Sequence, residues 1–289
     1  MPAFAYVDGR YGPIADAAVL VEDRGFQFAD SLYEVVAFLN GRFLDFDRHL
    51  WRLRRGLAAL FIDGVAGDAA LKAIAARLLR QSRYRDGILY VQISRGAARR
   101  GHAFPKAARP TVVMTARSFD FRKRLRQLQE GVAAVTLPDQ RWARSDLKTT
   151  GLLAAVLAKE EASRGGAFEA VLVNGDGLVT EGASSNLYLL DGGGRLITHP
   201  PSTAILAGVA RDGLLRLARQ AGVEVLERPF SVDEARGAAE LLLTSTTAPL
   251  LPIVSLDGRP VGNGAPGAMA ARLGRMMWEE VVRQTGWQG

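Results

Sequence analysis

Four short apolar segments follow one another between residues 170 and 198, with glycine-rich turns between them. The segments span residues 170–173, 177–180, 186–190 and 195–198. The turns are Asn174-Gly-Asp-Gly and Asp191-Gly-Gly-Gly. Short apolar runs bounded by such turns are typical of β-strands joined by hairpins. This region therefore predicts a sheet, and its glycines fit hairpin turns better than a dinucleotide-binding loop.

The rest of the chain mixes helical and extended patterns. Asp8-Gly9 predicts a hairpin over residues 6–14, because Asp-Gly between apolar segments favours a tight turn. The spacing of apolar residues and caps predicts helices over 31–39, 47–60, 68–79, 147–162, 206–222 and 265–284. Further strands are predicted over 87–94, 110–116, 131–137, 223–226 and 241–247. Strands outweigh regular strand–helix alternation, so the sequence predicts an α+β fold.

The chain of 289 residues is longer than a typical single domain, and we expect two. Apolar periodicity lapses over residues 117–130, where the densest cluster of positive charge lies. We place the junction there. The predicted domains are a small α/β domain, residues 1–120, and a larger domain, residues 121–289. The first contains a basic loop of fifteen residues, 95–109, which is long enough to have a function.

Composition argues against several classes of protein. The chain has no cysteine, and its three histidines stand far apart, so we expect no metal site. The net charge of +7 comes from arginines spread along the whole chain, which does not favour a nucleic-acid surface. No apolar run approaches the roughly 20 residues that cross a membrane, and the first residues do not resemble a signal peptide. We expect a cytoplasmic protein.

Two residues stand out for their chemistry. Lys148 lies at the predicted start of an apolar helix, where its neighbours would partly shield the amine from water. Such an amine can form a Schiff base with an aldehyde. Glu181 lies 33 residues later on a predicted strand, and a carboxylate there can keep a pyridine nitrogen protonated. Taken singly, each residue is more often an ordinary surface side chain, but together they indicate pyridoxal phosphate chemistry.

Several ordered motifs resemble the class IV pyridoxal phosphate aminotransferases, and within them most closely the D-amino acid aminotransferases. These motifs are Asp23-Arg-Gly-Phe-Gln-Phe-Ala-Asp-Ser-Leu-Tyr-Glu-Val, Lys148, Thr180-Glu-Gly-Ala-Ser-Ser-Asn and Thr244-Ser-Thr-Thr. The resemblance covers almost the whole chain. It implies the two-domain fold type IV architecture, with the lysine in the larger domain. It also implies pyridoxal 5′-phosphate as cofactor and a homodimer as the assembly.

The resemblance also implies roles for individual residues. Lys148 is the catalytic Schiff-base lysine, and Glu181 is the partner of the pyridine nitrogen. The cofactor phosphate would meet the main-chain N–H groups of Val209 and Ala210 at a helix start, where the helix dipole favours an anion. The other implied cofactor-binding residues are Arg52, Ser184, Ser245 and Thr246, and Ser184 and Asn186 would support either Glu181 or the cofactor ring. Ala210 departs from the threonine that similar D-amino acid enzymes often have.

The substrate carboxylate would be bound by Tyr33, Arg100 and His102. The planar guanidinium of an arginine can donate two parallel hydrogen bonds to a carboxylate, and a tyrosine or histidine can add another. The sequence thus predicts transamination between a D-amino acid, of the D-alanine or D-glutamate type, and a 2-oxo acid by a ping-pong mechanism. A branched-chain L-amino acid aminotransferase and an aminodeoxychorismate lyase of the same fold remain alternatives. A non-enzymatic basic binding module is the alternative from a different class.

Overall fold

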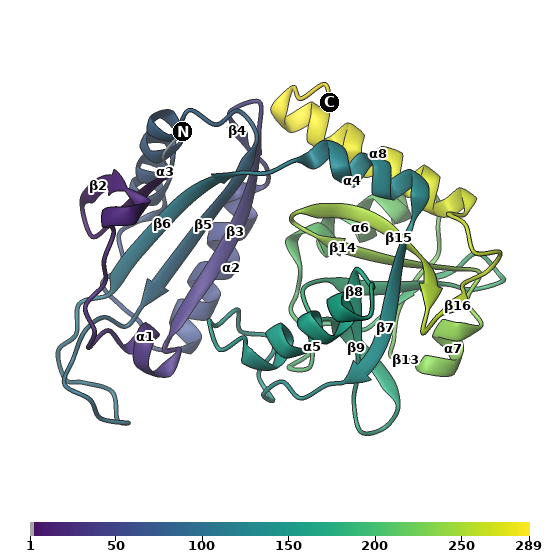
Figure 1. The fold of residues 1–289 in the computed structure, drawn as a ribbon, viewed down its shortest axis with the longest axis horizontal. Coiled ribbons are helices and arrows are strands. Elements are labelled where there is room, and N and C mark those ends of the chain that lie inside the picture. The colour runs from purple at the N-terminus through teal and green to yellow at the C-terminus, as the bar shows by residue number, and fades with distance from the viewer. Residues whose placement is uncertain (1–2) are drawn as a thin grey trace. The chain divides into compact units, whose positions relative to one another are not determined.

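The computed structural model describes residues 3–289 (Figure 1). They form two compact units. Of the described residues, unit 1 contains 3–120, together with Leu147–Gly151 and Gln284–Gln288. Unit 2 takes in Phe121–Asp146, Leu152–Arg283 and Gly289. Each unit combines helices with a sheet, and the predicted α+β class is confirmed.

Unit 1 is built on a sheet of antiparallel strands. Among the described residues, the sheet has six strands in the order β2-β1-β6-β5-β3-β4. The strands are β1 (Phe4–Val7), β2 (Arg10–Pro13), β3 (Ser31–Leu39), β4 (Arg42–Phe43), β5 (Gly87–Ser94) and β6 (Thr111–Ser118). The register of β3 and β5 runs from Ser31 opposite Ser94 to Phe38 opposite Gly87. β3 therefore lies between β4 and β5 in the sheet.

Helices α2 (Phe46–Ala59) and α3 (Asp68–Ser82) pack on this sheet. α2 buries Leu50, Leu53 and Leu57, which are three and four residues apart and so share one helix face. Two shorter elements precede β3, the 3-10 helix η1 (Ile14–Asp16) and the helix α1 (Arg24–Phe28). The predicted helices over 47–60 and 68–79 are confirmed, with small shifts in their ends.

The predicted helix over residues 31–39 was wrong, because these residues form β3. The Asn40-Gly41 pair that was interpreted as a helix end is instead the two-residue loop between β3 and β4. Both residues have positive φ angles, 51° and 73°, as the tight turn of a β-hairpin requires. Seven of the nine residues of β3 are buried, so the clear alternation that identifies a half-exposed strand is missing.

The end of the chain also packs in unit 1. The side chain of Gln284 and Asp45 exchange two hydrogen bonds of 3.0 and 3.1 Å. Trp287 is 7% exposed, and its indole Nε1 donates to Asp86 at 3.1 Å. A buried indole N–H that is paired in this way adds a polar anchor to the burial of a large ring. The last residues are thus held by unit 1, although the helix before them belongs to unit 2.

Unit 2 is built on a larger mixed sheet. Among the described residues it has ten strands, nine in the order β12-β11-β10-β14-β15-β7-β8-β9-β13, with β16 paired to β15. The strands are β7 (Val132–Pro138), β8 (Glu169–Val173), β9 (Leu178–Gly182), β10 (Asn186–Leu190), β11 (Leu196–Thr198), β12 (Val225–Glu227), β13 (Phe230–Ser231), β14 (Glu240–Ser245), β15 (Ala248–Leu256) and β16 (Arg259–Pro260). The strands predicted between residues 170 and 198 are β8 to β11. They form two antiparallel pairs, β8 with β9 and β10 with β11.

The helices of unit 2 cover its sheet. They are α4 (Phe121–Glu130), α5 (Leu153–Arg164), α6 (Val209–Gln220), α7 (Val232–Arg236) and α8 (Ala268–Thr285). α6 and α8 contribute Leu214, Leu217 and Leu273 to one buried cluster with the sheet residue Tyr188. Residues 117–130, where the apolar periodicity lapses, contain α4, a highly charged helix that buries Phe121. No helix within residues 3–289 combines the length and apolar character that a membrane span requires.

Candidate active site

Lys148 lies beside β3 of unit 1 and not at the start of a helix. The N–H of Tyr33 donates to the carbonyl oxygen of Lys148 at 3.0 Å, and the N–H of Thr150 donates to Ser31 at 3.3 Å. Thr149 forms an isolated β-bridge with Leu32 of β3, and its N–H donates to the carbonyl oxygen of Leu147 at 2.8 Å, so the backbone turns tightly at Lys148. The helix predicted over 147–162 therefore begins only at Leu153, in α5. The lysine was expected in the larger domain, and this pairing with β3 assigns it to unit 1.

The amine of Lys148 lies over an aromatic pair. Its Nζ atom is 4.2 Å from the ring centroid of Tyr33, which is within the range of a cation–π contact. Tyr33 stacks on Tyr90, with ring centroids 5.5 Å apart, and the Tyr90 hydroxyl donates to Gln92 at 2.8 Å. Burial, with a smaller effect of Tyr33, raises the pKa of Tyr90 to about 12, so this phenol stays neutral. Two predicted site residues, Lys148 and Tyr33, are thus in contact.

A buried ionic cluster follows Tyr33 on β3. The Glu34 carboxylate accepts two hydrogen bonds of 2.7 Å from Arg52 and one of 2.7 Å from the His49 ring. Burial alone would raise the pKa of Glu34, but the charge and hydrogen bonds of Arg52 outweigh it and lower this pKa to about 2. Burial lowers the pKa of His49, although Glu34 opposes the change. Arg52 was predicted as a cofactor residue, and two of its nitrogens are held by Glu34.

The sequence prediction did not include Glu34 or His49. A signal was available, because His49 and Arg52 stand three residues apart and so share one face of α2. A helix that presents two such side chains toward a sheet needs an acidic partner there. The partner could not be identified from the sequence while residues 31–39 were interpreted as helical.

Arg100 and His102 lie in the exposed loop after β5. The guanidinium of Arg100 is 4.7 Å from the ring centroid of Phe28, and the His102 ring is 5.8 Å from it. Arg24, which is buried, donates to the carbonyl oxygen of Gly101 at 2.6 Å and so fixes the loop. Within the described residues of the single chain, no hydrogen bond or ring contact joins either residue to Tyr33.

In unit 2, Glu181 lies near the end of β9 and is 5% exposed. Its carboxylate accepts hydrogen bonds from Asn186 at 3.0 Å, from the main-chain N–H of Leu206 at 3.1 Å, and from Arg141. Asn186 was expected to support Glu181, and the structure brings them together. Charged donors stabilise a buried carboxylate more strongly than neutral donors do. Glu181 is therefore held in a fixed orientation.

Arg141 was missing from the sequence prediction. Its side chain also donates to Asp139 at 2.8 Å and to the carbonyl oxygen of Ala204 at 3.0 Å. Burial alone would lower the pKa of Arg141, but the hydrogen bonds and charges of Asp139 and Glu181 raise it. The same pairing lowers the pKa of Asp139, against the effect of its burial. Nothing in the spacing of these residues identifies the pair, since Arg141 and Glu181 are 40 residues apart.

The predicted helix start at Val209 and Ala210 is the amino end of α6. Gly208 caps it without a side chain, so the first N–H groups of the helix meet no capping oxygen. A Cβ atom at Gly208 would lie 2.1 Å from the side-chain oxygen of Asn186, so only glycine fits this position. Open N–H groups and the helix dipole together favour an anion such as a phosphate.

The three remaining predicted residues lie elsewhere in unit 2. The Ser184 hydroxyl donates to Glu169 at 2.9 Å, and no described contact joins it to Glu181. The Ser245 hydroxyl accepts from the N–H of Ala248 at 3.1 Å, while Thr246 is in the turn between β14 and β15. Of the two partners expected for Ser184, the cofactor ring and Glu181, the structure does not pair it with Glu181, because its hydroxyl bonds to Glu169.

Comparison with known sequences identifies the family of this chain. The model of the amino-transferase class IV family matches residues 31–256. A D-alanine aminotransferase of Bacillus licheniformis is 38% identical over 278 residues, which cover 96% of this chain and 97% of that protein. A D-alanine aminotransferase of Listeria innocua serovar 6a is 36% identical and covers 94% of this chain and 93% of that protein.

Solved structures share the fold. A branched-chain amino acid aminotransferase of Escherichia coli matches with a TM-score of 0.90 at 22% identity, covering 100% of this chain and 97% of that one. A second branched-chain amino acid aminotransferase, complexed with N-(5′-phosphopyridoxyl)-L-glutamate, matches with a TM-score of 0.87 at 24% identity, covering 100% and 96%. The predicted fold and cofactor are confirmed: the chain belongs to the class IV aminotransferases, which are pyridoxal phosphate enzymes.

Proposed function

We propose that this enzyme transfers an amino group between a D-amino acid, of the D-alanine or D-glutamate type, and a 2-oxo acid. Two relatives that are 38% and 36% identical carry the name D-alanine aminotransferase, which supports the D-amino acid as substrate. The structural observation that carries the proposal is the Glu181 carboxylate, which is buried and held by Arg141 and Asn186.

Glu181 is the partner of the cofactor's pyridine nitrogen in this proposal. When bound, pyridoxal phosphate supplies an electron sink for the bonds at the substrate's α-carbon. A carboxylate with fixed donors on its other side keeps a proton at that nitrogen, because the positive charge is stabilised by a nearby anion. Arg141 and Asn186 orient the carboxylate, so they act on the cofactor only through Glu181.

The phosphate is bound at the start of α6. The N–H groups of Val209 and Ala210 meet no capping side chain there, which fits an anion of this size and charge. Arg52 adds a positive charge whose direction is fixed by its two hydrogen bonds to Glu34. Ser184, Ser245 and Thr246 remain proposed neighbours of the cofactor.

Lys148 is the residue that carries the cofactor and moves the proton. Its Nζ atom would hold the cofactor's aldehyde carbon, and once the substrate's amino group had displaced it, the free amine would take the proton from the substrate's α-carbon and return it. The Tyr33 ring under this atom limits the directions that the flexible lysine side chain can take. The main chain of Lys148 is fixed as well, through the hydrogen bond from Tyr33.

Tyr33, Arg100 and His102 bind the substrate carboxylate in this proposal. A guanidinium can form two parallel hydrogen bonds with a carboxylate, and a hydroxyl or imidazole can add a third. Arg100 and His102 are exposed on a loop that Arg24 fixes, so they are accessible to a small anion.

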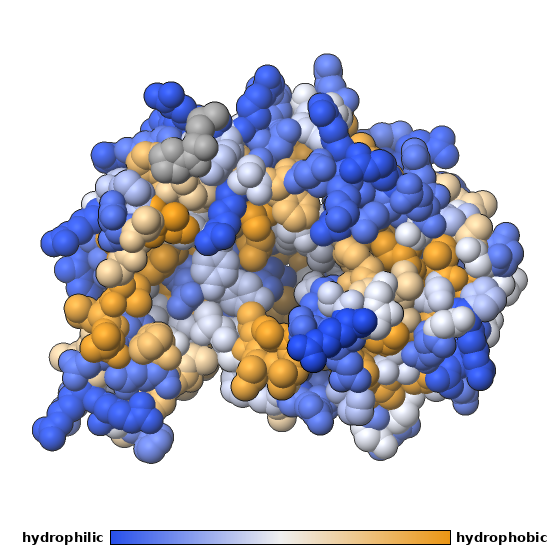
Figure 2. All heavy atoms as spheres, in the orientation of Figure 1, coloured by the Kyte–Doolittle hydropathy of each residue, from blue (hydrophilic) through white to orange (hydrophobic). Residues whose placement is uncertain are grey.

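We also propose that the enzyme is a homodimer. α5 exposes Leu153, Val156 and Leu157, with 71%, 56% and 57% of each residue accessible, and Leu152 before it is 38% exposed. Figure 2 shows apolar atoms at the position where Figure 1 draws α5. Neighbouring exposed aliphatic residues on one helix support an interface with a second copy of the chain. Light scattering should give the mass of a dimer, and Val156→Asp should shift it toward that of the monomer.

The test of the function is an assay with defined stereochemistry. Purified enzyme with pyridoxal phosphate should convert D-alanine and 2-oxoglutarate to pyruvate and glutamate. Initial rates at several concentrations of both substrates should give parallel double-reciprocal lines, as ping-pong kinetics require. L-leucine replaces D-alanine in the control reaction. Activity with L-leucine alone would reject the D-amino acid assignment.

A further inference from the structure

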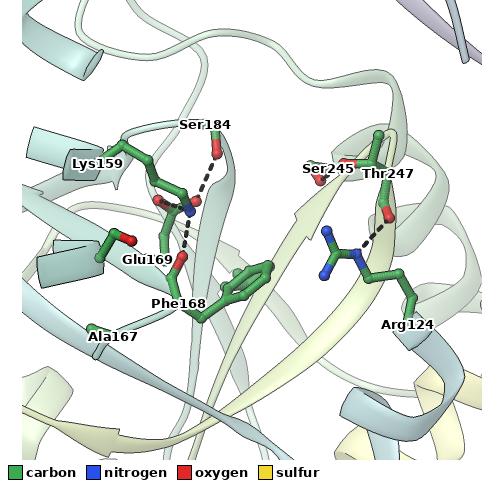
Figure 3. Close-up of a pocket in the computed structure, with 10 residues that line it drawn as sticks. Arg124, Lys159, Ala167, Phe168, Glu169, Ser184, Ser245 and Thr247 are labelled. Atoms are coloured by element: carbon green, nitrogen blue, oxygen red, sulfur yellow. Dashed lines mark hydrogen bonds and ion pairs between the residues drawn. The ribbon is translucent and has the colours of Figure 1, made fainter. Parts of the chain in front are cut away.

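A cavity of about 290 Å³ opens in unit 2, and its lining includes neither Lys148 nor Glu181 (Figure 3). One wall comes from α5 and the start of β8, and the other from α4 and the turn between β14 and β15. The polar lining consists mainly of Arg124, Lys159, Glu169, Ser184, Ser245 and Thr247. In Figure 3, Lys159 and Arg124 approach the cavity from opposite sides.

Both cationic side chains are positioned by the same aromatic ring. The guanidinium of Arg124 lies 5.0 Å from the centroid of Phe168, and the Lys159 ammonium lies 4.6 Å from it. Arg124 is also anchored by a hydrogen bond of 3.1 Å to the carbonyl oxygen of Thr247. Two long side chains that are held in this way lose less freedom when a ligand binds between them.

The one carboxylate in the lining already has its partners. Glu169 is 1% exposed, and one of its oxygens accepts from Lys159 and from the N–H of Ala170, each at 3.0 Å. The other oxygen accepts from Ser184 at 2.9 Å and from Ser185 at 2.8 Å. Two cations and one carboxylate leave the cavity with a net positive charge. A ligand anion therefore meets attraction there. Glu169 and the carbonyl oxygen of Phe168 accept two of the three N–H groups of Lys159, so a ligand would use the third.

Hydroxyl groups add donors at the opposite wall. The hydroxyl oxygens of Ser245 and Thr247 lie 3.4 Å apart, and only one of the two hydroxyls can donate to the other. The hydrogen of the second hydroxyl can therefore point into the cavity. Leu243 and the Phe168 ring supply apolar surface beside these groups. A small molecule with a carboxylate and a short hydrocarbon part matches this combination better than an inorganic anion does.

We propose that this cavity binds a carboxylate of a small organic acid, between Arg124 and Lys159. Two sources share this chemistry. The first is the side-chain carboxylate of a dicarboxylic substrate, and this source rests on the proposed transaminase function. The second is a separate small carboxylic acid that binds independently of the substrate.

Titration of the holoenzyme with glutarate tests the site by calorimetry. Arg124→Gln should weaken glutarate binding by about tenfold to a hundredfold, since a hydrogen bond to a charged group contributes about 1.5–3 kcal/mol. Arg126→Gln is the matched control, because Arg126 is an exposed arginine on the same helix. Lys159→Gln should act in the same direction, and Glu169 keeps three other donors in that variant. Inorganic phosphate should bind more weakly than glutarate to the wild-type enzyme.

Equal affinities for glutarate in Arg124→Gln, Lys159→Gln and Arg126→Gln would overturn the proposal, as would phosphate binding that matches glutarate.

Steady-state kinetics then separate the two sources. If the cavity takes the substrate's second carboxylate, Arg124→Gln raises KM for D-glutamate about tenfold and leaves KM for D-alanine unchanged. If the ligand is separate, both KM values stay unchanged and saturating D-alanine does not displace glutarate. An enzyme inactive on D-amino acids refutes the proposed function, while the calorimetry still decides the cavity.

Discussion

Each unit of the molecule contains one buried carboxylate that is paired with an arginine, but the two pairs are arranged in opposite ways. In unit 1, Glu34 is 2% exposed, and it fixes the more accessible Arg52. In unit 2, Arg141 receives support from Asp139 and a carbonyl oxygen, and it fixes Glu181. The first pair orients a donor and the second orients an acceptor. In the proposed function, Arg52 is the donor to the cofactor phosphate and Glu181 is the acceptor for the protonated ring nitrogen.

The largest expected effect comes from Lys148, which belongs to neither pair. Lys148→Ala should lower kcat by at least about 10³-fold, because it removes both the covalent attachment and the proton carrier. Borohydride reduction followed by peptide mapping should label Lys148 in the wild type and leave the variant unlabelled. Lys72→Ala, at an exposed lysine that pairs with Asp47, should keep normal turnover. A label at another lysine would remove Lys148 from the mechanism.

Glu34→Gln tests whether the unit 1 pair supports the fold. The variant leaves Arg52 without its charged partner in a buried place, and breaking such a pair costs about 3–5 kcal/mol in the free energy of unfolding. Urea unfolding of the wild type and the variant measures this loss. Asp68→Asn, which breaks the more exposed pair of Arg54 and Asp68, should change stability by less than about 1 kcal/mol.

Glu181→Gln tests the opposite arrangement in unit 2. Arg141 keeps its hydrogen bonds to Asp139, so we expect a smaller loss of stability than in Glu34→Gln. Turnover should fall by about 10²-fold or more, since a neutral amide does not hold the proton on the pyridine nitrogen. The ratio of kcat values and the two unfolding curves are the measurements. If both variants lost stability equally and kept kcat, the functional distinction between the pairs would be wrong.

The pH dependence of stability should reveal the unit 1 pair. The pKa of Glu34 is lowered from 4.5 to about 2, so the folded protein binds this proton less readily than the unfolded chain does. Its contribution, on the order of 3 kcal/mol, is complete above about pH 5 and is lost as the pH falls toward 2. The pKa of His49 is also lowered in the folded protein, so its contribution to stability is likewise lost as the pH falls, here below the usual pKa of 6.5. Unfolding curves of Glu34→Gln should be flatter across this range than those of the wild type.

The smallest expected effect concerns Tyr90, which supports the aromatic pair beside Lys148. Tyr90→Phe keeps the ring against Tyr33 and removes the hydrogen bond to Gln92, which contributes about 1 kcal/mol. Thermal unfolding should detect the change, and kcat should remain close to that of the wild type. A large fall in kcat would show that the phenol itself takes part in the reaction.

Local patterns in the sequence predicted most helices and strands, because glycine turns and apolar spacing report on neighbouring residues. They failed where tertiary contacts decide the conformation. Residues 31–39 are buried on both faces of a sheet, and this pattern cannot be told from a buried helix by spacing alone. Residues 147–151 are not helical because Lys148, Thr149 and Thr150 pair with β3, which lies more than a hundred positions earlier.

The candidate site shows the same division between local and distant information. The resemblance indicated a helix start at Val209 and Ala210, where α6 does begin, while the apolar pattern alone placed the start at residue 206. Arg141 was missed because its role depends on where β9 places Glu181. The bond of Ser184 to Glu169 was missed for a related reason, since β8 brings Glu169 within reach of its hydroxyl. Partners that are distant in the chain depend on the fold and not on spacing.

The route of the chain has a practical consequence for protein engineering. Leu147–Gly151 and Gln284–Gln288 belong to unit 1, although the chain around both segments belongs to unit 2. A fragment cut after residue 120 would lack the lysine and would leave the side chains that receive Trp287 open to water. Neither half of the gene therefore encodes a self-sufficient piece. A purification tag fused after residue 289 would be separated from the buried ring of Trp287 by only two residues.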